Sequence, residues 1–259
     1  MIRKWADLTQ ADFTELSPRC VAVLPLGATE QHGPHLSYNV DTCLIDAVLD
    51  QVETQADALQ LPTLTITKSD EHSGVPGTLS LGAETLLAVV RDIVASVAFT
   101  GIKRLVFFNG HGGNTALLEI AARAARIDHG LIAAQTSWFA HEDARLAGLN
   151  PKAQIYDLHA GETETSAMLA VCPEQVDMCK ACNFRTAMYV WEAAGHLTGL
   201  TGQPARPGWR IEDLNPDGAV GDASAATAAK GQQLIDTAAK GFGHWLEDFE
   251  HFDTGAFSS

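Results

Sequence analysis

The sequence predicts one α/β domain whose mostly parallel sheet carries helices on both faces. Apolar runs with strand character alternate with helical stretches of about 12–17 residues, which is typical of a parallel sheet. Three clusters rich in histidine, acidic residues and glycine lie near strand ends or helix starts, where α/β folds bind ligands. No repeat, linker or break in composition divides the 259 residues. We therefore expect a single domain spanning residues 1–259.

Composition excludes several classes of protein. A hydrophobic content of 46% is ordinary for a globular chain, and no window approaches the roughly 18–20 apolar residues of a membrane span. The first residues lack the apolar core of a secretory signal. A net charge of −15 without a basic patch disfavours polyanions. We expect a cytoplasmic protein that has neither a nucleic acid nor a membrane as its partner.

The first half of the chain contains two expected strands and two expected helices. Residues 20–26 form a buried strand that leads into a polar loop, and apolar residues at helical spacing predict a helix over 42–54. Residues 59–67 alternate and are β-branched, so they predict a second strand. The long connection 68–82 precedes an apolar helix over 83–99, and connections of such length are often functional.

The second half continues the alternation. A short buried strand ends in a glycine-rich turn, and Asn114 is the expected N-cap of the helix that follows. Residues 173–221 hold many glycines and prolines and are expected to be irregular, and the acidic tail 247–259 is expected to be peripheral. The remaining expected elements are strands over 104–108 and 131–138 and helices over 115–127, 167–171 and 223–242.

The loop after the first strand is rich in metal-binding groups. Glu30, His32, His35 and Asp41 lie within it, between glycines and prolines. Acidic oxygens and imidazole nitrogens gathered at the carboxyl end of a strand suit a divalent metal. The alternative is a polar surface loop with solvated histidines. The loop by itself does not decide between the two.

Two later clusters provide partners for this loop. His111 lies in the glycine-rich turn 109–114, and the glycines explain the turn without explaining the imidazole. His159, Glu162 and Glu164 lie around a small-residue turn, and their charges cannot all be buried without partners. Acidic residues could instead stabilise a helix N-terminus there. Because all three clusters are expected at one edge of the sheet, we predict a pocket there.

Cysteine spacing provides no further site. Five cysteines are widely spaced in a chain too large to need disulfides, and Cys179 and Cys182 form a lone C-x-x-C. A zinc knuckle needs a second pair of ligands, and a redox motif needs a βαβ context that is missing. We therefore expect these cysteines to be incidental.

With these clusters in place, the sequence resembles the creatininase (creatinine amidohydrolase) family. The matching motifs occur in family order and span most of residues 20–240. They are residues 27–36 with Asp41, residues 76–81, 109–114 and 159–166, and residues 218–222 with Lys230 and Gly231.

The resemblance implies a three-layer α/β/α fold and a binuclear site for zinc, manganese or iron, in a homohexamer built as a trimer of dimers. It implies that Glu30 and His111 hold one metal and that His32 holds the other, with Asp41 as a bridge. In creatininase a glutamate two places after the histidine of the Asn-Gly-His motif also binds the second metal. Here that place is Gly113, which nominates Glu162 instead.

The substrate pocket departs from the family pattern. Gly112 stands where creatininase has a tyrosine near its substrate, and Leu158 stands where an acidic residue is expected. Metal-centred chemistry is expected to survive both changes. Creatinine itself is therefore not assured as the substrate.

The mechanism that we expect is hydrolysis of a non-peptide C–N bond in a small-molecule amide, such as creatinine, a lactam or a formamide. A metal-bridging hydroxide would attack the carbonyl. His159 would act as general base and then acid, and Glu164 would orient it or a ligand. His72, Ser73 and Gly112 are expected to contact the substrate. The alternatives are a metal-dependent peptidase of the same family and a non-catalytic metal-binding scaffold.

Overall fold

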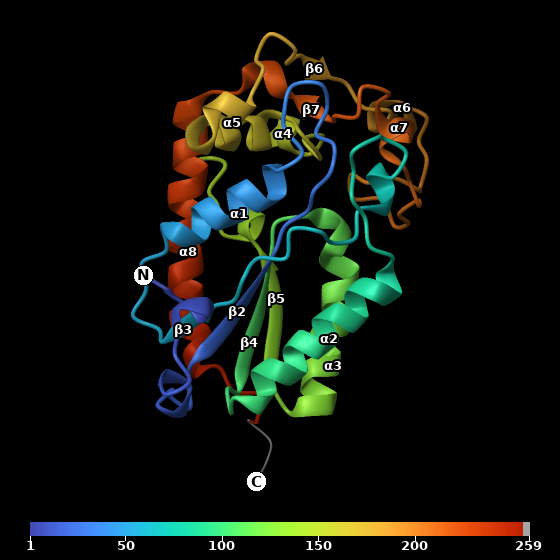
Figure 1. Cartoon of the computed structure of the whole chain (residues 1–259). Coiled ribbons are helices and arrows are strands. Elements are labelled where there is room, and N and C mark those ends of the chain that lie inside the picture. Colours follow the sequence, from blue (N-terminus) through green and yellow to red (C-terminus); the bar gives the residue numbers. More distant parts are fainter. Residues whose placement is uncertain (256–259) are drawn as a thin grey trace.

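The central sheet has five parallel strands in the order β1-β3-β2-β4-β5, and helices cover both of its faces (Figure 1). The structure is a computed structural model and describes residues 1–255. The strands of this sheet are β1 (Arg3–Lys4), β2 (Val21–Leu26), β3 (Ala58–Gln60), β4 (Arg104–Asn109) and β5 (Ile132–Ser137). The helices are α1 (Val40–Asp50), α2 (Ala83–Phe99), α3 (Thr115–His129), α4 (Pro151–Gln154), α5 (Glu162–Val171), α6 (Met188–Ala193), α7 (Ile211–Leu214) and α8 (Ala228–His251).

Alternating side chains of the strands build two hydrophobic cores. In β2, Val21 and Val23 pack with α1, α5 and α8, whereas Ala22 and Leu24 pack with α2 and α3. Every residue of β2 is buried, as expected for a central strand with both faces covered. The α/β class, the three layers and the mostly parallel sheet are thus confirmed.

Two expected elements were wrong in their extent. The strand expected over 59–67 is regular only over Ala58–Gln60, because Pro62 has no amide hydrogen to donate to a sheet. Beyond the proline it pairs again as an isolated parallel bridge between Leu64 and Leu26. The final helix begins at Ala228 instead of 223, since the Thr227 side chain accepts from Lys230 N and caps it. That helix continues to His251 and buries Phe249, so the start of the expected peripheral tail belongs to the core.

Two further expectations were wrong near helix starts. Asn114 precedes α3, but its side chain makes no cap hydrogen bond. Its amide instead donates to Thr67 Oγ1 at 3.2 Å and to Asn109 Oδ1 at 3.2 Å, which fixes the turn after β4. Helix α5 begins at Glu162, five residues before the expected start, and so carries the acidic cluster in its first turn.

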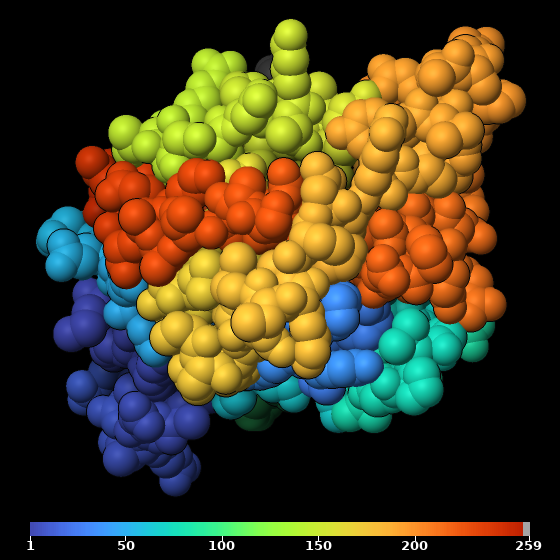
Figure 2. Space-filling view, turned by 90° about the horizontal axis from the view of Figure 1, so that it is seen from above, coloured from blue at the N-terminus to red at the C-terminus, as the bar shows by residue number. Residues whose placement is uncertain are grey.

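The region expected to be irregular contains some regular structure. Helices α6 and α7 lie in it, and β6 (Asn183–Phe184) pairs antiparallel with β7 (Gly221–Asp222). In Figure 2 the gold segment after α5 lies against the blue loop after β2, where Asp177 N donates to His35 O at 2.8 Å. This contact holds the outer side of the loop that carries the acidic and imidazole groups.

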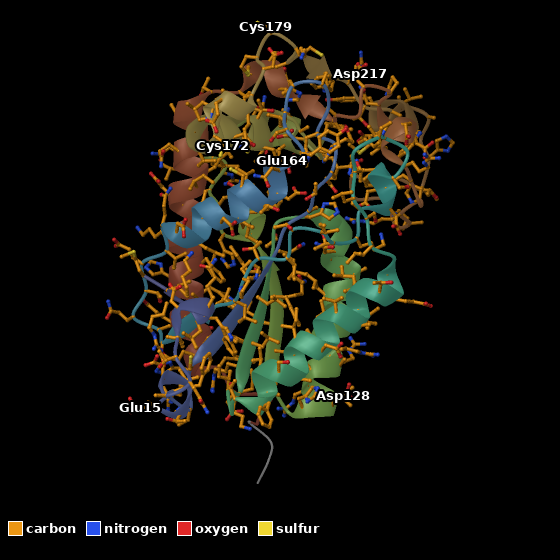
Figure 3. The ribbon with its side chains drawn as sticks, viewed as in Figure 1. Glu15, Asp128, Glu164, Cys172, Cys179 and Asp217 are labelled. Atoms are coloured by element: carbon orange, nitrogen blue, oxygen red, sulfur yellow. The ribbon has the colours of Figure 1, made fainter. Side chains whose placement is uncertain are left out.

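The described cysteines form no disulfide, and the described helices are not of the membrane-spanning kind. All five cysteines have free thiols, and Cys179 and Cys182 are exposed (Figure 3 labels Cys179 on an outer turn). Among residues 1–255, no helix combines the length and the apolar character needed to cross a membrane.

Helix α8 packs closely against α5, and a glycine permits the approach. A Cβ on Gly231 would lie 1.8 Å from Ser166 O, which is closer than any real contact. The α5 backbone could relieve this clash only by moving, and α5 carries Glu162 and Glu164. The spacing of the two helices therefore depends on this glycine.

We predict that Gly231→Ala lowers the free energy of unfolding by about 1–3 kcal/mol because of overpacking. In an unpacked helix the same change would instead raise the free energy of unfolding by about 1 kcal/mol through helix propensity. A decrease would therefore show that Gly231 packs tightly against α5. Urea unfolding would measure it, with Gln233→Ala on the exposed face of α8 as the matched control. Equal stability of the Gly231 variant and the wild type would contradict this account.

Candidate metal centre

Buried acidic and imidazole side chains gather at the carboxyl ends of β2 and β4. The loop after β2 provides Glu30 and His32, the first turn of α1 provides Asp41, and the turn after β4 provides His111. The exposed fraction of each of these four side chains is at most 5%. Such groups are buried only when partners stabilise them.

Asp41 lies between the two imidazoles. Its Oδ1 lies 3.5 Å from His32 Nε2, and its Oδ2 lies 3.5 Å from His111 Nδ1. Glu30 Oε1 is 3.2 Å from the same His111 nitrogen. The ligand atoms of Glu30, Asp41 and His111 lie within 4.8 Å of one another, as a metal site requires.

A second group of potential ligands surrounds His32. His32, His159 and Glu164 also bring ligand atoms within 4.8 Å of one another. Glu164 Oε2 is 3.8 Å from His32 Nε2 and accepts a hydrogen bond from Ala160 N at 2.5 Å. Ala160 has a positive φ of 54°, a conformation that costs a non-glycine residue free energy. This turn sets the position of Glu164 relative to His159.

Three buried atoms in these groups lack a hydrogen-bond partner among the described residues. They are Glu30 Oε1, His32 Nε2 and Asp41 Oδ2. A buried polar atom without a partner costs free energy, and a buried charge costs more. Divalent cations would remove that cost, and carboxylate and imidazole groups are the ligands that such cations take. The residues therefore fit a metal.

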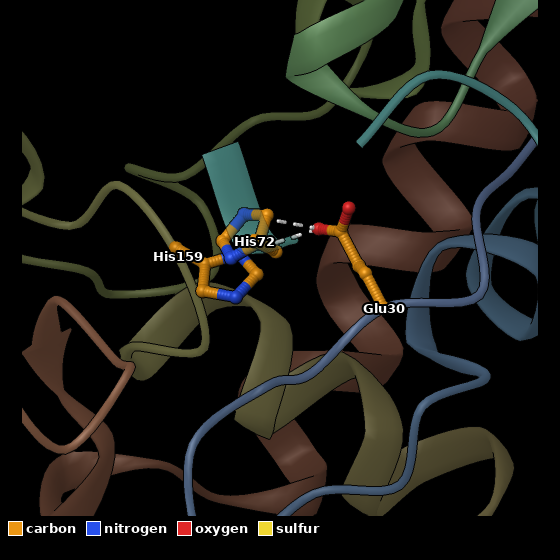
Figure 4. A group of neighbouring side chains, drawn as sticks. All are labelled: Glu30, His72 and His159. Carbon is orange, nitrogen blue, oxygen red and sulfur yellow. Dashed lines mark ion pairs between the residues drawn. The ribbon is translucent and has the colours of Figure 1, made fainter. Parts of the chain in front are cut away.

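A third group joins His72 and His159 to Glu30 (Figure 4). The amide nitrogen of Gln31 donates to His72 Nδ1 at 2.8 Å and to Gly218 O at 2.8 Å. His72 Nε2 therefore carries the proton and lies 3.4 Å from Glu30 Oε1. His159 Nε2 donates to Gln31 O at 2.8 Å, which leaves its Nδ1 as the acceptor, 3.7 Å from Glu30 Oε1.

The remaining expected site residues lie elsewhere or act differently. Glu162 does not join these groups, because its carboxylate pairs with Lys230 Nζ at 2.5 Å. The exposed Ser73 donates its hydroxyl to Asp70 O at 2.8 Å and does not line the pocket. Gly112 lines the pocket. His35 does not join the ligand groups, and its Nε2 forms a hydrogen bond with Thr165 Oγ1 at 2.9 Å.

Sequence reasoning missed several contributors. Ser69 donates to Glu30 Oε2 at 2.5 Å, and Glu71 Oε1 lies 3.4 Å from His111 Nε2. A Cβ on Gly113 would lie 2.0 Å from that Glu71 oxygen. Gln31 stands between two expected ligands, so its place in the motif was a usable signal. Ser69 and Glu71 lie in the long loop and carried no comparable signal.

A pocket of about 390 Å³ opens beside these groups. Its lining includes candidate ligand groups and apolar side chains, namely His111, His159, Glu164, Glu142, Phe139, Leu158 and Trp209. Figure 3 shows Glu164 at this end of the sheet, near α1 and α5. The size and the mixed lining suit a small molecule or a short segment of chain.

The charges around His32 decide how it holds protons. Burial by itself would lower the pKa of His32, but the carboxylates of Asp41 and Glu164 raise it to about 9. Burial raises the pKa of Glu164 to about 7. Burial and the imidazoles of His32 and His72 hold the pKa of His159 well below its ordinary value, so His159 is neutral.

We predict that metal binding to the metal-free protein releases protons. A metal takes neutral imidazole, and His32 remains protonated below about pH 9. Affinity for Mn²⁺ should therefore rise with pH across about 6 to 9. Calorimetry in two buffers of different ionisation enthalpy would measure the protons released. An affinity that does not change with pH would contradict the prediction.

A second prediction separates the two glutamates of α5. Glu164→Gln should lower the bound metal by about one ion per chain, because Glu164 lies beside His32. Glu162→Gln, the matched variant two residues away, should keep its metal because Glu162 pairs with Lys230. Elemental analysis of both purified proteins would measure this. Metal loss confined to the Glu162 variant would reverse the assignment.

The parallel sheet, together with buried carboxylates and imidazoles at its strand ends, is the arrangement of a metal-dependent hydrolase. Residues 6–246 match the family model for creatininase, described as creatinine amidohydrolase. The chain belongs to the creatininase family.

Several proteins of known name resemble this chain in sequence or in structure. A creatinine amidohydrolase from Pseudomonas putida is 36% identical over 185 residues, which are 66% of this chain and 71% of that protein. A mycofactocin precursor peptide peptidase from Mycobacterium ulcerans is 35% identical over 224 residues, which are 82% and 79% of the two chains. A solved structure named creatininase Mn superposes with a TM-score of 0.72 at 25% identity, over 96% of this chain and 99% of that one.

Proposed function

We propose that this protein is a binuclear metal-dependent hydrolase that cleaves the C–N bond of a small, non-peptide amide. The observation that carries this proposal is the place of Asp41, which directs one carboxylate oxygen to His32 and the other to His111. A carboxylate so placed suits a bridge between two metal ions. The pocket beside them gives a small amide access to both.

The proposed ligand sets share Asp41. Glu30, Asp41 and His111 would hold one ion, and His32, Asp41 and Glu164 would hold the other. Glu164 replaces our sequence-based choice of Glu162. Manganese, zinc and iron all accept such oxygen and nitrogen ligands.

The protein's own groups would then position and protonate the substrate. When bound, the ions would lower the pKa of a water molecule and polarise the amide carbonyl. Gly112 bears no side chain and lines the pocket, so an amide can come close to the ligands there. Ser69 donates its hydroxyl to Glu30 Oε2, which fixes the position of that carboxylate and leaves Oε1 for a metal.

His159 is the proposed acid–base group. Its Nε2 is committed to Gln31 O, so Nδ1 alone can accept a proton. Its low pKa keeps it neutral, so the Nδ1 lone pair is available to accept a proton from water, and the protonated ring would be a strong acid towards the leaving nitrogen. His159 also lies close enough to His32 and Glu164 to be a ligand, which the experiment below distinguishes.

A peptide bond is the second candidate for the substrate. The mycobacterial relative named as a peptidase aligns over 82% of this chain, more than the creatinine amidohydrolase does. Gly112 and Leu158 also depart from the pattern that the family resemblance implies for the substrate pocket. A panel of creatinine, lactams, formamides and short peptides would separate the two candidates.

We also propose that the protein assembles as a homohexamer, as the family resemblance implies, and that it works in the cytoplasm. Sedimentation equilibrium of the purified chain would test the assembly. A monomer that turns over substrate at full rate would contradict it.

We predict that His159→Ala retains both metals and lowers kcat about 10²–10⁴-fold on the best substrate of that panel. The exposed His129→Ala serves as control and should change neither quantity. Elemental analysis beside initial rates would measure both. Loss of one metal would make His159 a ligand, and unchanged turnover would remove it from the mechanism. A metal-loaded wild type without turnover on any member of the panel would favour a non-catalytic scaffold.

A further inference from the structure

One carboxylate in the pocket wall has no partner. Glu142 lines the pocket, and its Oε2 is shielded from water and makes no hydrogen bond to any described residue. No ion pair among residues 1–255 involves it either. Glu142 as a whole is only partly buried, but a carboxylate oxygen that lacks both water and a donor is costly. The place of this oxygen in a pocket wall points to an external partner.

The other carboxylates of the pocket are engaged. Asp157 accepts from Thr163 N at 2.9 Å and from Gln154 Nε2 at 3.1 Å. Glu71 lies 3.6 Å from Lys68 Nζ and also faces His111. Asp41 and Glu164 belong to the proposed ligand sets. Glu142 is therefore the acidic group of this pocket that remains available.

Among the described residues, none offers Glu142 a positively charged partner. The pocket lining contains no lysine or arginine, and its three histidines belong to the groups around Glu30. Burial and the neighbouring Asp143 raise the pKa of Glu142 to about 7, which is the effect expected of an uncompensated charge. A bound cation would restore the ionised form.

The surrounding lining suits an organic cation. Phe139, Leu158 and Trp209 line the same pocket, and 38% of Phe139 and 44% of Leu158 remain exposed. Aromatic rings attract cations placed over their faces, and apolar walls cover the carbon atoms beside a charged nitrogen. The wall thus combines one carboxylate with apolar surface.

We propose that Glu142 binds a cationic nitrogen, an ammonium or a guanidinium, carried by the substrate. This inference rests on the proposed function, since it assigns the substrate class of the same pocket. The substrate would be an amide with a positively charged group and an apolar portion. Glu142 and the apolar wall would hold that end while the amide faces the ligand groups.

The test compares two probes on the metal-loaded full chain by calorimetry. Benzylammonium carries the cation, and benzyl alcohol has the same ring without the charge. We expect the wild type to bind benzylammonium at least about 10-fold more tightly, as a charged hydrogen bond would give. Glu142→Gln should lose this preference, with benzyl alcohol binding unchanged within about 2-fold.

Controls make each outcome decisive. The exposed Glu84→Gln on α2 removes the same charge at a residue that does not line the pocket, and it should keep the preference. Circular dichroism verifies that the near-isosteric Gln variant is folded. Equal binding of the two probes to the wild type, or a preference that survives in the Glu142 variant, would overturn the proposal. Because the assay needs no turnover, it can succeed even if the protein hydrolyses no amide, and it can fail while hydrolysis is intact.

Discussion

The buried carboxylate of Asp41 is the constraint on which the site depends. It lies in the first turn of α1, so the helix sets its position, and its two oxygens face imidazoles from two different loops. A Cβ on Gly110 would lie 2.6 Å from Asp41 O, so the turn after β4 can approach only because that residue is glycine. One carboxylate, one glycine and two parallel strands thus bring three chain segments to one point.

Much of the fold followed from local patterns. The apolar helix over residues 83–99 matches α2 at both ends, because its periodicity and its flanking residues agree. β-Branched character overstated the second strand, since Pro62 interrupts the regular pairing and only an isolated bridge at Leu64 follows it. The start of α8 depended on a threonine cap, and its far end on the burial of Phe249, which only tertiary packing determines.

For the site, too, local motifs indicated some residues, while tertiary contacts determined others. The motif positions gave Glu30, His32, Asp41 and His111, which the fold brings together. Sequence spacing could not choose between the two glutamates of α5, because residues two apart on a helix face different directions. What distinguishes them in the structure is Lys230, 68 residues away, which pairs with Glu162, whereas Glu164 lies beside His32. Pairings across such separations have no local signature.

Gly113 also constrains how this chain can change over evolutionary time. The space that a side chain at this position would need is occupied by the Glu71 carboxylate, which lies beside His111. A side chain acquired at 113 would therefore require the flexible end of Glu71 to move, and also the His111 ring, whose Nε2 would lie 2.3 Å from the new Cβ. A substitution at 113 would therefore displace two side chains of the candidate metal centre at once, so this position is tied to the geometry of the site.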